Sequence, residues 1–147
     1  MTVSSGDGSE ARIDRKAQAK GFDLGLDLGF DLLGGDLTTL VLTGANGLTL
    51  DTNSTIVSSV DASGLGGKFT WDAGANTVAI TVRTGAGGSD VDFTQMTIPG
   101  GNASTGTAPI TFIGGSGDDL ITTGNLGTSR GTITTGSGDD VVFVGIV

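Results

Sequence analysis

The sequence predicts an all-β protein built as a parallel β-solenoid or β-roll with an N-terminal arm and strand. Three observations lead to this fold class. Gly supplies 28 of the 147 residues, which disfavours helices because Gly costs a helix roughly 1 kcal/mol relative to Ala. From about residue 38 onward, short segments rich in Thr, Val and Ile alternate with Gly/Asn/Asp turns. Segments of about 20–30 residues also resemble one another, which is typical of coils that stack on a shared core.

The repeats are clearest in the second half of the chain. Segments 60–90 and 91–119 each open with Val-Asp, contain an Ile-Thr strand and close with a Gly-rich turn that ends in Asp. Asp61, Asp90 and Asp119 are therefore equally spaced along the chain. A shorter unit over 120–140 closes in the same way at Asp140. We expect the solenoid to occupy residues 38–147.

Two segments precede the repeats. Residues 1–20 form a polar, basic N-terminal arm, which is either a solvated tail or a contact to the acidic body of a neighbouring copy. Four of the chain's seven cations lie in it: Arg12, Arg15, Lys16 and Lys20. Residues 21–37 alternate apolar side chains with Asp and Gly between Phe22 and Leu32, which predicts one amphipathic strand. Its Asp-bearing face is either a solvated edge or a surface that pairs with another subunit.

The composition excludes several function classes. The chain has no His and no Cys, so it cannot form a Ser-His-Asp triad, a Cys-His pair or an ordinary zinc site. We therefore expect no enzyme. The formal net charge of −9 would repel nucleic acid and instead favours divalent cations.

Two glycine turns carry the strongest chemical signal. Residues 114–122, GGSGDDLIT, fit the nonapeptide GGxGxDxUx at every defined position, and residues 135–143, TGSGDDVVF, fit it except at the first. Residues 85–90, GAGGSD, are a degenerate third copy. Backbone carbonyls and carboxylates in a Gly-rich turn suit Ca²⁺, which takes six to eight oxygen ligands. The distance along the chain from Gly117 to Gly138 is close to two nonapeptides with a short insertion, so we expect both turns on one edge, one coil apart.

On these nonapeptides, residues 110–147 resemble the calcium-binding repeats of RTX-type parallel β-rolls. The resemblance implies that Asp119 and Asp140 are side-chain ligands, that Asp118 and Asp139 assist, and that glycine carbonyls complete the shell. The candidate metal ligands are Gly114, Gly115, Gly117, Asp118, Asp119, Gly136, Gly138, Asp139, Asp140 and, at the degenerate turn, Asp90. The alternative is a plain turn in which each Asp caps its own backbone. The opposite edge, 123–131, contains no acid and in this departs from the family.

The wider pattern of residues 38–119 is similar to bacterial S-layer and surface-adhesin proteins. It implies a secreted structural protein, stabilised by calcium, that assembles on the cell surface as a lattice or filament. We expect copies to meet through residues 21–37 and the apolar C-terminal strand 141–147, VVFVGIV. A cell-surface glycan or lipopolysaccharide is a further candidate partner. Because Met1–Glu10 is polar, we expect export without an N-terminal signal peptide.

Two other functions stay open. One is a calcium-dependent adhesin or ligand-binding module. An ice-binding surface is disfavoured because Thr122, Thr123, Thr132, Thr134 and Thr135 do not form a regular Thr-x-Thr ladder. The other is the calcium-folding export module of a larger secreted protein.

Overall fold

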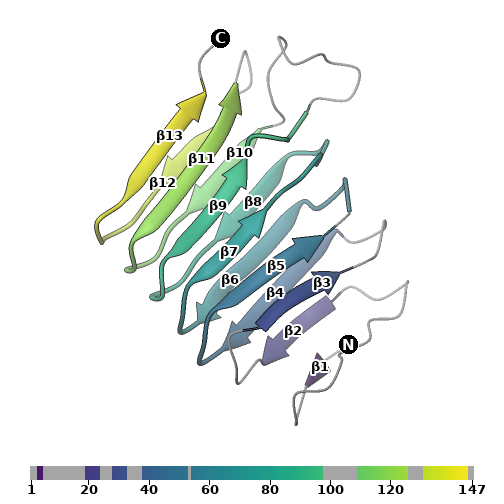
Figure 1. Ribbon diagram of the computed structural model, residues 1–147, viewed down its shortest axis with the longest axis vertical. Coiled ribbons are helices and arrows are strands. Elements are labelled where there is room, and N and C mark those ends of the chain that lie inside the picture. The colour runs from purple at the N-terminus through teal and green to yellow at the C-terminus, as the bar shows by residue number, and fades with distance from the viewer. Residues whose placement is uncertain are drawn as a thin grey trace.

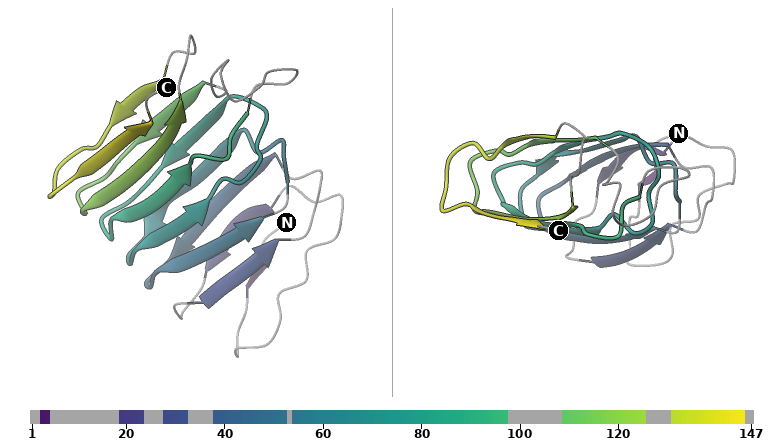
Figure 2. Two further views of the ribbon diagram at one scale, coloured as in Figure 1. Left: turned by 45° about the horizontal axis from the view of Figure 1, so that its top comes forward. Right: turned by 90° about the horizontal axis from the view of Figure 1, so that it is seen from above.

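The computed structural model describes residues 3–4, 19–23, 28–32, 38–52, 54–97, 109–125 and 131–145, and for 3–4, 19–23, 28–32 and 51 it describes the backbone alone. Every regular element in these residues is a strand, and every pairing between strands is parallel. Two sheets face each other across one core (Figures 1 and 2). The predicted all-β parallel solenoid is confirmed. None of the described residues belongs to a helix long and apolar enough to cross a membrane.

The chain alternates between the sheets, so that each strand of sheet A is followed by one of sheet B from β2 onward. Among the described residues, sheet A has seven strands, in spatial order β1 (Val3–Ser4), β2 (Ala19–Asp23), β4 (Thr39–Gly44), β6 (Ser59–Leu65), β8 (Ile80–Arg83), β10 (Ile110–Ile113) and β12 (Thr132–Thr134). In the same residues sheet B has six, in the order β3 (Leu28–Leu32), β5 (Leu48–Thr52), β7 (Phe69–Asp72), β9 (Ser89–Phe93), β11 (Asp119–Asn125) and β13 (Val141–Gly145).

The strand register gives the length of each coil. Leu28 pairs with Leu48, Leu48 with Phe69 and Phe69 with Ser89, so these three coils are nearly equal in length. Ser89 pairs with Asp119, which makes the next coil longer, with a sequence separation of 30. The longer coil reflects the extra chain between β9 and β10. The regular spacing of Asp61, Asp90 and Asp119 is therefore not the coil repeat.

The N-terminal segment differs from the expectation. Residues 19–23 pair with β4 in sheet A, whereas residues 28–32 pair with β5 in sheet B. The single amphipathic strand predicted over 21–37 is wrong, because the chain changes sheets between β2 and β3. Val3 and Ser4 also pair with β2, so the predicted arm over 1–20 contributes strand residues to sheet A. An alternating pattern assigns side chains to two faces but does not reveal where a chain turns.

The core lies between the sheets and is built from aligned inward-facing residues. In sheet A, one column consists of Leu40, Val60, Val82, Phe112 and Ile133, each paired with the next in register. The first four are at most 1% exposed. In sheet B, the ring of Trp71 lies 6.4 Å from the rings of both Phe69 and Phe93. Stacking thus buries apolar side chains that no single coil could cover.

Candidate metal centre

The two predicted turns lie together at one edge of the solenoid. Residues 114–118 connect β10 to β11, and residues 135–140 connect β12 to β13. The Asp139 backbone N–H donates to Asp118 Oδ1 at 2.9 Å, and the Asp119 N–H donates to Asp140 Oδ1 at 3.0 Å. Four of the predicted ligands, Asp118, Asp119, Asp139 and Asp140, are therefore close neighbours one coil apart, as the spacing of the two turns predicts.

Close stacking explains the glycines of these turns. A Cβ atom on Gly117 would lie 2.1 Å from the Gly88 nitrogen, and one on Gly115 would lie 2.3 Å from the Gly85 carbonyl oxygen. Gly136 and Gly138 have φ values of +89° and +128°, which L side chains rarely adopt. These glycines allow the backbone of one turn to rest on the next.

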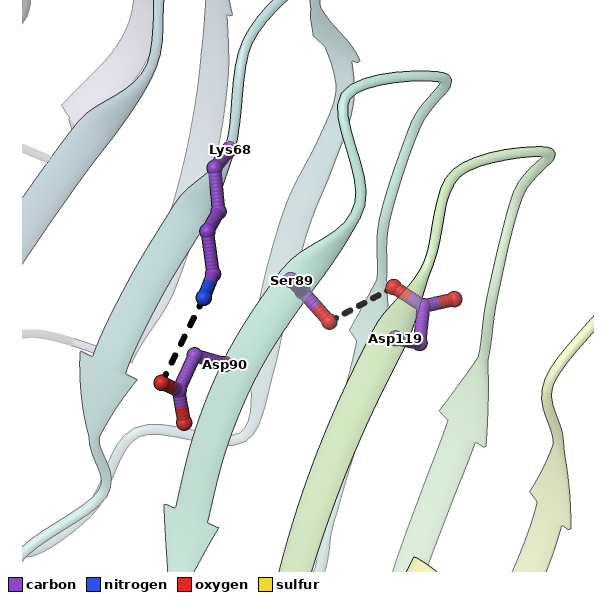
Figure 3. A network of polar contacts seen from close by, with 4 residues as sticks. All are labelled: Lys68, Ser89, Asp90 and Asp119. Carbon is purple, nitrogen blue, oxygen red and sulfur yellow. Dashed lines mark hydrogen bonds and ion pairs between the residues drawn. The ribbon is translucent and has the colours of Figure 1, made fainter. Parts of the chain in front are cut away.

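Asp119 occupies a position that is apolar two and three coils earlier in the stack. In register, Leu48, Phe69, Ser89 and Asp119 form one inward-facing column in sheet B. Asp119 is only 2% exposed. Its Oδ1 accepts a hydrogen bond from Ser89 Oγ at 2.7 Å (Figure 3). It accepts a second one from Thr84 Oγ1 at 3.2 Å. The column therefore changes from hydrocarbon to hydroxyl and carboxylate toward the C-terminal end.

The surroundings of Asp119 disfavour its charged form. Burial raises the pKa of its carboxyl group, and the nearby carboxylates of Asp140 and Asp118 raise it further. Hydrogen bonds from Ser89 and Thr84 act in the opposite direction, because they stabilise the carboxylate. No Lys or Arg among the described residues pairs with any of the four turn carboxylates. A bound cation would supply the missing positive charge.

Asp90 does not join this group. It pairs in register with Leu120 rather than with Asp119, so its side chain belongs to the outer face of sheet B. There it forms an exposed ion pair with Lys68 at 3.5 Å (Figure 3), of the kind that contributes little stability. Ser89, and not Asp90 as the repeat pattern predicted, is the residue that lies beside Asp119. Neither Ser89 nor Thr84 was among the predicted ligands. Ser89 was passed over for Asp90 because a one-residue shift in the repeat alignment exchanges inward and outward positions.

The donor atoms at this edge are of the chemical type that a hard cation prefers. All their donors are carboxylate, hydroxyl or carbonyl oxygens, which suit Ca²⁺ better than metals that prefer imidazole or thiolate. Asp118 and Asp140 each use one carboxylate oxygen to accept a backbone N–H. No group of three or more acidic side chains in the described ranges is gathered tightly enough to hold an ion. A bound ion would therefore depend on backbone carbonyls as well as side chains.

Two further rows run along the outer faces of the sheets. On sheet A, Thr39, Ser59, Thr81, Thr111 and Thr132 pair in sequence and form a column of hydroxyl side chains. On sheet B, Asp72 pairs with Asp92. Each of these two carboxylates accepts a backbone N–H from further along its own turn, from Gly74 and Thr94 respectively. This is the turn-capping arrangement that Asp commonly adopts.

Comparison of the chain with protein-family models, with curated proteins and with solved structures gave no match.

Proposed function

We propose that this protein is a secreted structural protein of the RTX-repeat type, which self-assembles on the bacterial surface as an S-layer-like lattice or filament and is stabilised by calcium. The observation that carries the proposal is the last strand, β13. Val141, Val142, Phe143 and Val144 are 45%, 38%, 58% and 52% exposed, whereas the inward-facing apolar residues of the preceding coil are buried. An open sheet edge made of apolar residues is a surface suited to another chain.

Calcium would hold the turns that support this end. Asp119 and Asp140 would supply carboxylate oxygens, and the glycine carbonyls of 114–117 and 136–138 would supply the others. The ion would offset the repulsion between carboxylates that lie one coil apart. Because β11 and β13 begin directly after these turns, calcium binding would order the strand that assembles.

A calcium titration tests the metal half of the proposal. We expect calorimetry to detect binding to the wild-type chain, and the variant Asp119→Asn/Asp140→Asn to bind at least about tenfold more weakly. The matched control is Asp72→Asn/Asp92→Asn, which removes the same charge from sheet B at a place outside the two glycine turns. Asn also caps turns, so this control should bind as the wild type does. No binding heat for the wild type would refute the calcium proposal.

Sedimentation tests the assembly half. The wild-type chain should form large species in calcium, visible by electron microscopy. Val142→Asp should remain monomeric, because it places a charge at the apolar end while the rest of the core is untouched. Thr49→Asp adds the same charge to the outer face of sheet B far from the end, and it should assemble normally. A wild-type chain that stays monomeric at high concentration with calcium would rule out self-assembly.

The hydroxyl column on sheet A favours a second candidate, a calcium-dependent adhesin that binds a cell-surface glycan or lipopolysaccharide. The neighbouring outward column reads Val41, Asp61, Arg83, Ile113 and Thr134, so the face carries one hydroxyl column and not the paired Thr-x-Thr rows of an ice-binding surface. Thr81→Val/Thr111→Val should abolish binding to purified lipopolysaccharide and leave assembly unchanged if this face is the adhesive one.

A further inference from the structure

The turn over 114–118 lies between two other turns at this edge of the solenoid. Residues 84–88 connect β8 to β9 on one side of it, and residues 135–140 connect β12 to β13 on the other. We call the contact between 84–88 and 114–118 the first interval, and the contact between 114–118 and 135–140 the second interval. The two intervals differ in how their polar groups are satisfied.

Main-chain hydrogen bonds close the first interval at both of its ends. The Thr84 N–H donates to the Ile113 carbonyl oxygen at 3.0 Å, and the Ser89 N–H donates to the Asp118 carbonyl oxygen at 3.1 Å. The side chains of Thr84 and Ser89 are at most 4% exposed. Both of their hydroxyl groups donate to the carboxylate of Asp119, and Figure 3 shows the bond from Ser89. The first interval therefore contains a hydroxyl–carboxylate contact at its inner side.

In the second interval, side chains replace the main chain as hydrogen-bond partners. The Asp119 N–H donates to Asp140 Oδ1 at 3.0 Å, and the pairing of β11 with β13 begins one residue later, at Leu120 and Val141. The corresponding N–H of the first interval, that of Ser89, donates to a main-chain carbonyl instead. The second interval is thus lined by carboxylates at the place where main-chain hydrogen bonds close the first.

The two carboxylate oxygens of Asp119 have different surroundings. Oδ1 accepts the short hydrogen bond from Ser89, whereas Oδ2 lies 3.5 Å from Thr84 Oγ1, which is long for a hydrogen bond. A Cβ atom added to Gly114 would meet both Asp119 Oδ2 and the Thr135 carbonyl oxygen, so these two oxygens lie beside the same glycine. A carboxylate oxygen and a carbonyl oxygen from successive turns are ligands of the type that Ca²⁺ takes.

We propose that Ser89 and Thr84 are positioning residues for calcium, which hold Asp119 through Oδ1 and thereby confine the ion to the second interval. This inference rests on the proposed calcium binding and specifies which residues limit it. A hydroxyl donor satisfies a carboxylate oxygen and adds no negative charge, so the first interval offers a cation one carboxylate where the second offers several. A ligand fixed in this way presents its other oxygen in one orientation, and such supporting hydrogen bonds strengthen metal binding.

Converting Ser89 to a carboxylate tests the confinement. Ser89 pairs in register with Asp119, so Ser89→Asp places a second carboxylate in the first interval and should bind about one more calcium ion per chain than the wild type. The matched control is Thr70→Asp, which adds the same charge one coil away from Asp90 on the outer face of sheet B. This control should leave the number of bound ions unchanged. Calorimetry and equilibrium dialysis measure that number, and circular dichroism verifies that each variant is folded.

Removing the hydroxyl groups tests the positioning without adding charge. Ser89→Ala should keep the number of bound ions but bind calcium at least about tenfold more weakly, because Asp119 loses its supporting hydrogen bond. Thr84→Val has nearly the same shape as the wild type without the donor and should also weaken binding. Thr84→Ser retains the hydroxyl and should restore the wild-type affinity, which a purely steric role of Thr84 would not predict.

Three outcomes count against the proposals. An unchanged number of bound ions in a folded Ser89→Asp variant would overturn the inference and leave calcium binding intact. Wild-type affinity in Ser89→Ala would overturn it as well, even if Ser89→Asp does not fold. A wild-type chain that binds no calcium would refute the proposed function itself.

Discussion

At the scale of single residues, the unusual group is the carboxyl of Asp119. It stands in a column that begins with Leu48 and Phe69, and hydrogen bonds from Ser89 and Thr84 replace only part of the hydration that it loses on burial. An Asn would fit the same space without the charge. The charge of Asp119 therefore costs desolvation, which the proposed calcium ligation would offset.

The raised pKa of Asp119 makes metal-free stability depend on pH. Between the ordinary value of 3.8 and the raised pKa, the folded chain holds a proton that the unfolded chain has lost. The free energy of unfolding therefore falls as pH increases through this range. In chelator, Asp119→Asn should lose less stability than the wild type as the pH rises from the ordinary Asp pKa toward neutrality, as measured by thermal melting.

Ser89→Ala sharpens this test. The Ser89 hydroxyl stabilises the Asp119 carboxylate and lowers its pKa, so removing it should extend the loss of stability to higher pH. Calcium should reverse the trend for the wild type, because the ion requires the charged form. Identical pH slopes for the wild type and Asp119→Asn in chelator would mean that Asp119 does not titrate in this range.

At the scale of elements, the turns are as closely stacked as the strands. The hypothetical Cβ atoms of Gly87, Gly115 and Gly117 would meet backbone atoms of the preceding coil at 2.1–2.3 Å. Backbone cannot move aside as a flexible side chain can. The glycines thus serve the stacking directly, whether or not a metal is bound.

Gly115→Ala should consequently lower the free energy of unfolding by about 1–3 kcal/mol, the usual range for forcing extra atoms into a packed region. The control is Gly74→Asn. Gly74 has φ +54°, a Cβ added to it would meet no atom within 4 Å, and Asn tolerates this conformation. Urea unfolding in chelator separates this packing effect from metal binding. An equal loss for both variants would show that close stacking is not what Gly115 provides.

The sequence predicts which segments form strands and turns better than it predicts how the strands of successive coils align. The two GSGDD turns lie on one edge because an identical motif, repeated after the length of one coil, leaves little freedom. The place of Asp90 could not be inferred, because a shift of one residue exchanges the two faces of a strand. The change of sheet between β2 and β3 could not be inferred from the sequence for a related reason. Alternation from Phe22 to Leu32 is compatible with one long strand or with two short ones.

At the scale of the whole molecule, the two halves of the solenoid are held together differently. The coils from β4 to β9 have Leu48, Phe69 and Trp71 at inward positions of sheet B. In the coils from β10 to β13, by contrast, Asp119 is the first residue of β11 and Asp140 directly precedes β13. In a stacked repeat, each coil is stabilised mainly by its neighbours. Stability can therefore vary along the stack, and calcium would act on the C-terminal half.

Hydrogen exchange measures this difference along the chain. In chelator, amides of β10–β13 should exchange faster than those of β4–β9, because local opening there loses fewer apolar contacts and separates repelling carboxylates. Calcium should slow exchange in β10–β13 and change β4–β9 little. Asp119→Asn/Asp140→Asn should show no such calcium effect. Uniform protection by calcium across both halves would instead indicate that the solenoid unfolds as one cooperative unit, with the metal stabilising all coils equally.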